Sequence, residues 1–442
     1  MSPTTQGFIV LLVTLAMLLS GIPVAFGLGA ISIVFLLIFQ GFDSMRVVAE
    51  TFYAGLDDFT LVSIPMFVMM GAAIGSSPAG KDLYEALDRW LYRLPGGLAI
   101  SNIGACAIFA ALTGSSPACC AAIGKMGIPE MRRRGYPDEV ATGAICAGGT
   151  LGILIPPSIT FILYGIATET SIGRLFIAGV LPGLMLTGLF ILWTLFTIWR
   201  RGFRSHAVDF RYSWKQKFTS LPKIAPFVAI IVGVMYVLYG GIATPSEAAG
   251  VGAALCLALA IVIYGLWQVD QLWLILRDTM RESVMILTII AAAVLFGYML
   301  TSLYLTQTLA QGIADLHANK WVLMFLINVF LLVCGFFIPP AAIILMTSPI
   351  LLPIITAAGF DPVWFGVILT INMEIGLIHP PVGLNIYIVN AIAPDVPITK
   401  VMWGTLPYVL CMMLAIVILC VFPEIATWLP DHMMGAAPAG GR

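Results

Sequence analysis

The chain has 442 residues, of which 60% are apolar and only 10% are charged, whereas about 25% of the residues of a soluble domain are charged. This composition excludes an ordinary soluble protein and indicates an all-α polytopic membrane protein. The net charge of −1 and the lack of a separate basic domain argue against nucleic acid as a partner.

Apolar stretches that match the hydrocarbon core of a lipid bilayer follow one another along the chain. A crossing helix needs about 20 residues. Several stretches are longer and have room for two short elements or a re-entrant hairpin, so we expect about ten to twelve membrane elements. The N-terminal stretch lacks the features of a secretory signal, and we interpret it as a retained membrane element. The stretches lie near 7–40, 59–78, 96–128, 138–168, 172–198, 222–268, 283–313, 321–357, 362–393 and 399–428.

One long polar segment interrupts these stretches and is rich in lysine and arginine. By the positive-inside rule this connector is cytoplasmic, and the basic cluster at 132–134, two crossings earlier, falls on the same side. We therefore predict four parts of the chain. They are a first membrane repeat at 1–198, the basic cytoplasmic connector at 199–223, a second membrane repeat at 224–428 and a polar C-terminal tail at 429–442.

The two membrane repeats resemble each other. The sequence Gly-Ile-Leu-Ile-Pro-Pro at 152–157 returns as Gly-Leu-Ile-His-Pro-Pro at 376–381, and Gly135–Asp138 matches Gly359–Pro362 at the same offset. Two adjacent prolines remove two backbone donors inside an apolar run. Such paired interruptions in two halves are typical of a secondary transporter with its site near the bilayer midplane.

The loops that correspond in the two repeats differ in charge. The basic cluster at 132–134 has an uncharged counterpart at 356–360. This asymmetry indicates that the counterpart faces the other side of the membrane. We therefore predict two inverted-topology repeats with re-entrant hairpins and broken helices, although any single glycine or proline taken alone is better explained by a kink or by close helix packing.

The breaks indicate what the protein binds. An unwound segment presents carbonyl oxygens, which suit a cation such as sodium, and helix N-termini, which suit a carboxylate. Thr113, Ser115 and Ser116 precede the first break and add neutral oxygens without the charge that favours divalent ions. The pattern predicts a cation-coupled transporter of an anion.

Polar residues inside apolar runs are functional candidates by default. Glu374 is either a proton carrier or a paired structural acid, and Glu247 either caps a helix after Thr244 or takes part in transport. Ser76 lies in a stretch that is either a re-entrant hairpin near the substrate or an ordinary helix end. The candidates around the second Pro-Pro pair are Asn372, Glu374, His379 and Asn385.

Enzymatic motifs are missing from the sequence. The eight cysteines lie in apolar runs without metal-ligand spacing and are expected to be small buried hydrophobic residues. The four histidines do not form an HExxH motif. We therefore expect no enzymatic activity.

Longer motifs surround the breaks, namely Thr113–Ser116, Ile128–Met131, Ala147–Ser158, Gly179–Gly183, Ala243–Ala249 and Gly376–Gly383. Together they resemble the large membrane (M) subunit of tripartite ATP-independent periplasmic (TRAP) transporters over nearly the whole chain. The resemblance implies two partners, a small four-helix membrane (Q) subunit on a separate chain and a soluble periplasmic substrate-binding (P) protein. It also implies the bacterial inner membrane, sodium as the co-transported ion, no organic cofactor, and an elevator motion of a transport domain against a scaffold.

The resemblance also assigns residues. The first sodium site of the family carries over onto Thr113, Ser115, Gly152, Ile155 and Pro157. By the internal repeat, the second sodium site consists of Pro339, Gly376, His379 and Pro381. We expect the substrate near Ser76, Ser116, Ser158, Asn372 and Asn385. The substrate is a C4-dicarboxylate or another organic acid, and the alternative function is a stand-alone sodium/dicarboxylate symporter of the related inverted-repeat architecture.

Overall fold

The computed structural model describes residues 3–92, 94, 96–201, 212–315, 319–380 and 383–435. Within these ranges every regular element is a helix, which confirms the all-α prediction. By length and composition six of these helices suit a membrane crossing, or seven if the bent pair Phe42–Leu56 and Phe59–Gly75 counts as one span. The number is smaller than the expected ten to twelve because several of the expected elements are half-length helices joined at breaks.

The first half of the chain places a hairpin and a broken span before one long helix. The hairpin consists of α6 and α7, and the broken span consists of α8 and α9, joined through the 3-10 turn Leu151–Ile153. The helices are α1 (Pro3–Leu19), α2 (Val24–Gln40), α3 (Met45–Leu56), α4 (Ser63–Gly75), α5 (Ala79–Leu91), α6 (Gly97–Thr113), α7 (Ser116–Arg133), α8 (Asp138–Thr150), α9 (Ile159–Thr168) and α10 (Ile172–Arg200).

The second half repeats this order after the connector. Its helices are α11 (Trp214–Phe218), α12 (Leu221–Tyr239), α13 (Pro245–Val262), α14 (Val269–Ser302), α15 (Leu305–Asp315), α16 (Lys320–Gly335), α17 (Pro340–Ala357), α18 (Pro362–Ile378), α19 (Leu384–Ile392), α20 (Ile398–Val421) and α21 (Glu424–Met434). The hairpin α16/α17, the broken span α18/α19 and α20 therefore correspond to α6/α7, α8/α9 and α10.

Two details refine the sequence predictions. The Thr244 backbone N–H donates to the Glu247 carboxylate over 2.8 Å, and the Thr244 hydroxyl accepts from the Glu247 N–H in return. This is a capping box, so the interpretation of Glu247 as a helix cap is confirmed. The predicted polar tail at 429–442 begins inside α21, and residues 436–442 lie outside the described ranges.

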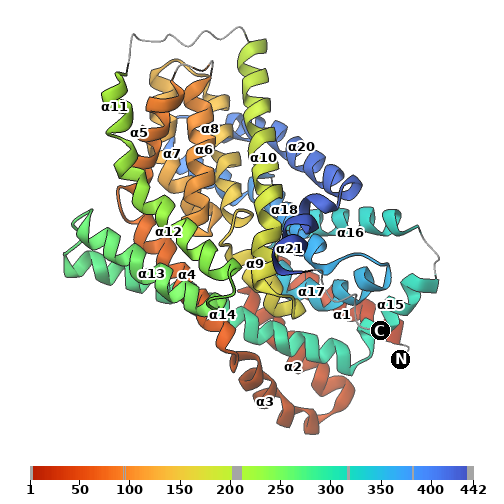
Figure 1. Cartoon of the computed structure of the whole chain (residues 1–442). Helices are drawn as coiled ribbons and strands as arrows, with labels where there is room; N and C mark the ends of the chain where they lie inside the picture. Colours follow the sequence, from red (N-terminus) through yellow and green to blue (C-terminus); the bar gives the residue numbers. More distant parts are fainter. Residues whose placement is uncertain are drawn as a thin grey trace.

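The two halves pack crosswise. Helix α7 contacts α19 while α17 contacts α9, and α8 contacts α20 while α10 contacts α18. In Figure 1, α10 stands between α6, α7 and α8 on one side and α16 on the other, and α14 crosses the lower part of the molecule. Every residue from 140 to 154 and from 363 to 378 is buried, so α8 and α18 form the centre of the core, as expected of helices that are covered all round.

Helices α8 and α20 approach through a pair of glycines. A Cβ on Gly143 would lie 2.2 Å from the Gly404 carbonyl oxygen, and one on Gly404 would lie 2.3 Å from the Glu139 carbonyl oxygen. Such close backbone approach is how helices pack in membranes, where burying apolar side chains from lipid gains little. The two glycines therefore fix the distance between the two repeats at this point.

The base of the α6/α7 hairpin is bound to α5. The Arg134 guanidinium donates to both carboxylate oxygens of Asp88, over 3.0 and 2.8 Å, and to Glu130 over 2.9 Å. The Tyr212 hydroxyl donates to the same Asp88 carboxylate over 3.0 Å, and burial, followed by the Asp88 charge, raises the pKa of this phenol above its usual value. Bidentate charged pairs are strong and directional, so the hairpin base is held firmly.

We expect Gly404→Val to lower the stability of the solubilised protein by about 1 to 3 kcal/mol, because overpacking a close contact forces the helices apart. The measurement is the melting temperature in detergent. Gly233→Val on α12 is the control, since no atom lies within 4 Å of the Cβ position at Gly233. An equal loss of stability in both variants would contradict the role of the glycine contact.

Candidate functional site

The first hairpin breaks at its tip for local reasons. Gly114 ends α6 in the left-handed region with a φ of +57°, which glycine adopts at little cost. Ser115 follows in an extended conformation, and Pro117 lies in the first turn of α7, where the missing N–H is not needed. The Gly114 N–H still donates to the Ala110 carbonyl of α6 over 2.9 Å, and the Ser115 carbonyl accepts from the Cys119 N–H of α7 over 3.1 Å, so the tip is a short break between two hydrogen-bonded helix ends.

The hairpin tip touches the break of the α8/α9 span. A Cβ on Gly152 would lie 2.7 Å from the Ser115 carbonyl oxygen, and a Cβ on Gly114 would lie 3.0 Å from the Pro157 carbonyl oxygen. Ile155, half-buried, lies between these contacts and donates its N–H to the Leu151 carbonyl over 3.0 Å. The structure thus brings together the two chain segments that the sequence predicts as the first sodium site.

The hydroxyl groups around this contact have different surroundings. Thr113 donates to the Phe109 carbonyl of its own helix over 3.2 Å. Ser158 caps α9 by accepting from the Phe161 N–H over 3.4 Å. The Ser115 hydroxyl has no hydrogen-bond partner among the described residues and is free to bind a ligand.

Asn385 connects the second broken span to the first hairpin. Its side-chain amide donates to the Ser116 hydroxyl over 2.8 Å and to the Cys146 carbonyl over 3.2 Å, and it is fully buried. Two of the residues that we expect near the substrate therefore lie in contact. Asn372 lies elsewhere, because its amide donates to Asn328 on α16 over 2.6 Å.

The second break repeats the close backbone contact. A Cβ on Gly376 would lie 2.5 Å from the carbonyl oxygen of Gly335, the last residue of α16. Pro339 precedes α17 in an extended conformation, and the ring of His379 stacks on Phe336 with 4.4 Å between ring centroids. Pro381, the remaining residue of the predicted second sodium site, lies outside the described residues.

A cavity of about 490 Å³ opens beside the first hairpin tip. Its wall includes Thr113 and Ser115 from the tip, and Ser76 from the turn between α4 and α5. This turn joins two ordinary helix ends, so Ser76 reaches the cavity without a re-entrant hairpin. Three residues predicted for the sodium site or the substrate therefore share one cavity.

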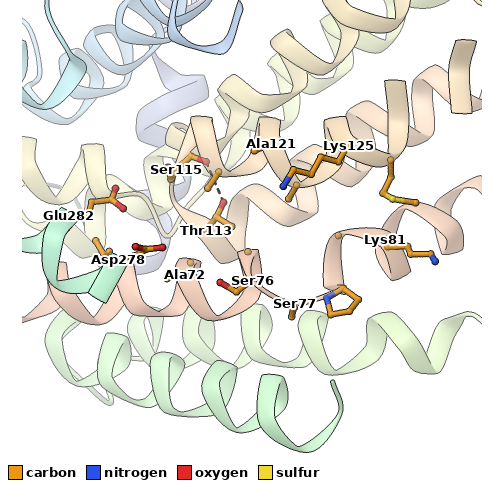
Figure 2. A pocket seen from close by; sticks show the side chains of 18 of the residues that line it. Ala72, Ser76, Ser77, Lys81, Thr113, Ser115, Ala121, Lys125, Asp278 and Glu282 are labelled. Atoms are coloured by element: carbon orange, nitrogen blue, oxygen red, sulfur yellow. Dashed lines mark hydrogen bonds between the residues drawn. The ribbon is translucent and has the colours of Figure 1, made fainter. Parts of the chain in front are cut away.

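Four charged residues that the sequence predictions did not include also line this cavity. They are Lys81 on α5, Lys125 on α7, and Asp278 and Glu282 on α14. In Figure 2, the Lys125 amine points toward Ser115 and Thr113, whereas the Lys81 amine points away from them. Lys125 is the first charged residue along the α6/α7 hairpin, after an uncharged stretch from Gly97 to Gly124, and that position is the signal by which it was recognisable.

A second cavity of about 500 Å³ continues from the first toward the hairpin base. Lys125 and Met126 line both cavities. The wall of the second cavity includes Arg133 and Arg134, which lie in the basic cluster that we predict on the cytoplasmic side. Lys125 therefore lies where the two cavities meet, between the hairpin tip and the basic base.

Comparison with known protein families identifies the family of this chain. A family model described as "Tripartite ATP-independent periplasmic transporter, DctM component" matches residues 10–425. The chain belongs to this DctM family. The resemblance noted in the sequence is confirmed, and the chain is a multi-pass membrane transport protein.

Relatives within the family match over most of their length. The "C4-dicarboxylate TRAP transporter large permease protein DctM" of Pseudomonas aeruginosa is 36% identical, over 88% of this chain and 91% of that protein. The "Sialic acid TRAP transporter large permease protein SiaM" of Vibrio cholerae is 30% identical, over 95% and 97%. The "Isethionate TRAP transporter permease protein DctMQ" of Oleidesulfovibrio alaskensis is 33% identical, over 92% of this chain and 64% of that protein.

A solved structure shares the fold. The YdaH transporter of Alcanivorax borkumensis, whose structure is described as having an unusual topology, matches with a TM-score of 0.62. The match covers 90% of both chains at 18% sequence identity. At this sequence identity the likeness shows that the two chains share a fold, and it carries no conclusion about function.

We expect Gly152→Val to abolish transport while membrane insertion is retained, because the new side chain would separate the hairpin tip from the broken span. The measurements are substrate uptake and the amount of protein in the membrane fraction. Gly188→Val on α10 is the matched control, since its Cβ position has no atom within 4 Å. Normal uptake by Gly152→Val would contradict the importance of the contact.

Proposed function

We propose that the chain is the membrane-embedded subunit of a sodium-coupled secondary transporter that imports an organic acid. The observation that carries this proposal is the backbone contact between the hairpin tip and the broken span, Ser115 against Gly152, at the edge of a cavity that contains a lysine. Unwound backbone in a membrane protein supplies carbonyl oxygens for a cation, and an ammonium group attracts a carboxylate.

The sodium ions are cargo in this proposal. Thr113, Ser115, Gly152, Ile155 and Pro157 would hold one ion through carbonyl and hydroxyl oxygens, which fit a monovalent cation because none of them is charged. Pro339, Gly376 and His379, together with Pro381, would hold the second. The free Ser115 hydroxyl and the close approach at Gly376 support this assignment.

The substrate class follows from the family. The relatives are named for a C4-dicarboxylate, sialic acid and isethionate, all of which are organic acids. We propose that a periplasmic substrate-binding protein delivers such an acid to this chain in the bacterial inner membrane. A small Q subunit would complete the assembly, and the longer relative named DctMQ supports such a partner.

The proposed motion is an elevator. The two hairpins and two broken spans would form the transport domain, since they pack on one another across the two repeats, and α1 to α4 with α12 to α14 would form the scaffold. Movement of a whole domain against a scaffold changes access without unfolding the buried breaks. The cavity that continues from the tip to the basic hairpin base corresponds to the side open to the cytoplasm.

Reconstitution separates this function from its alternative. We expect proteoliposomes with this chain and its Q subunit to take up the substrate only when an inward sodium gradient and the cognate binding protein are both present. A stand-alone sodium/dicarboxylate symporter would instead transport with this chain alone. Uptake without the binding protein would therefore overturn the tripartite assignment.

We expect Ser115→Ala to raise the sodium concentration needed for half-maximal uptake, because the substitution removes one oxygen from the first sodium site. The size of the effect is about three- to tenfold, as for the loss of one modest polar interaction. The measurement is uptake against sodium concentration at saturating substrate. Ser20→Ala is the control, since the Ser20 hydroxyl donates to the Met17 carbonyl of its own turn over 2.6 Å and does not line the cavity. Unchanged sodium dependence in Ser115→Ala would remove Ser115 from the site.

A further inference from the structure

The two lysines that line the first cavity differ in whether they have a partner. Lys125, which is exposed, has no ion-pair or hydrogen-bond partner among the described residues. Lys81, in contrast, lies 3.9 Å from Glu85 and points away from the hairpin tip in Figure 2. One unpaired ammonium group, that of Lys125, is therefore available to a carboxylate in the cavity.

The opposite wall of the cavity is acidic. Asp278 and Glu282 follow each other at a spacing of one helical turn on α14, and Figure 2 shows both beyond Thr113 and Ser115 as seen from Lys125. Asp278 lies 3.4 Å from Arg277, whereas Glu282 has no ion-pair or hydrogen-bond partner within the described part of the chain. The unpaired charge on this wall is therefore negative.

Neutral hydroxyls lie between these two charged walls. Ser115 and Ser76 line the same cavity, and neither hydroxyl has a hydrogen-bond partner in the ranges that the structure describes. A hydroxyl both donates and accepts, so these serines suit a polar and uncharged part of a ligand. From Lys125 to Glu282 the cavity thus presents a cation, then hydroxyls, then an anion.

We propose that this cavity selects organic acids with one carboxylate and with a hydrogen-bond donor, either a hydroxyl or an ammonium group, at the far end. The inference rests on the proposed function and deepens it. The single carboxylate pairs with Lys125, and the donor faces Glu282. A second carboxylate at the far end is disfavoured, because it would meet the like charges of Glu282 and Asp278 instead of a partner for a donor.

Three acids of equal length test the proposal: 4-hydroxybutyrate, 4-aminobutyrate and succinate. They share a four-carbon chain with one carboxylate and differ at the far end, which is a hydroxyl, an ammonium group or a second carboxylate. The measurement is the rise in melting temperature of the complex of this chain with its Q subunit in lipid nanodiscs, with sodium present, since a ligand that binds the folded state stabilises it. We expect stabilisation by 4-hydroxybutyrate, by 4-aminobutyrate or by both at concentrations about tenfold lower than for succinate.

Substitutions of Lys125 and Glu282 test whether each wall of the cavity contributes to this selectivity between acids. Lys125→Met should raise the half-maximal concentration of every stabilising acid by about tenfold or more, since a charge-assisted hydrogen bond is lost. Glu282→Lys should reverse the order so that succinate binds best. The matched controls are Lys215→Met, on the exposed face of α11, and Glu424→Lys, on the exposed start of α21, and both should keep the order of the unchanged protein.

The outcomes are distinct. Equal or stronger stabilisation by succinate in the unchanged protein, or an order that Glu282→Lys does not alter, would overturn the proposal. Lack of stabilisation by all three acids would overturn it as well. Failure of the proposed function would be visible separately, as lack of sodium-driven uptake in the reconstituted system whatever the order of the three acids.

Discussion

A peptide group that loses its helical hydrogen bond inside a bilayer has no water to replace it, so another part of the protein, a ligand or an ion must become its partner. In this chain the two broken regions are supported by backbone from neighbouring helices. Gly152 lies against the Ser115 carbonyl and Gly376 against the Gly335 carbonyl, with no room for a Cβ at either glycine. The close backbone contact explains why these two positions are glycines, one in the turn Leu151–Ile153 and one near the end of α18, and the rest of the fold is arranged to maintain these contacts.

The supporting contacts act at both ends of the first hairpin. At its base, Arg134 binds Asp88 on α5 through two hydrogen bonds. Near its tip, Asn385 from the second repeat binds the Ser116 hydroxyl. A hairpin held at both ends keeps Ser115 in one place relative to the broken span, and a binding site needs such positional definition to hold a small cation.

The charged residues of the cavity lie on two different parts of the fold. Lys125 is on the hairpin, whereas Asp278 and Glu282 are on α14, which we assign to the scaffold. In an elevator the two walls belong to parts that move relative to each other, so the charge pattern around a substrate would change between the two ends of the motion. Binding at one end and release at the other require such a difference in interaction energy between states.

The sequence by itself determined the class of protein, the duplication and the location of the breaks. Hydropathy and the Gly-x-x-x-Pro-Pro pattern suffice for this because the conformational preferences of glycine and proline act locally. The family motifs extended the prediction to Thr113, Ser115 and Gly152, and the structure brings these residues to one place, although sodium binding there remains a prediction.

Only the tertiary structure decided which distant residues meet. Asn372 and Asn385 look equivalent in the sequence, yet one contacts α16 and the other contacts the first hairpin. Residues of α4, α5, α7 and α14 line one cavity. Which distant helices lie next to each other depends on the packing of whole helix surfaces, and local hydrophobic periodicity does not specify it. The same reason explains why Lys125 and Glu282 were recognised as parts of one site only once the helices were in place.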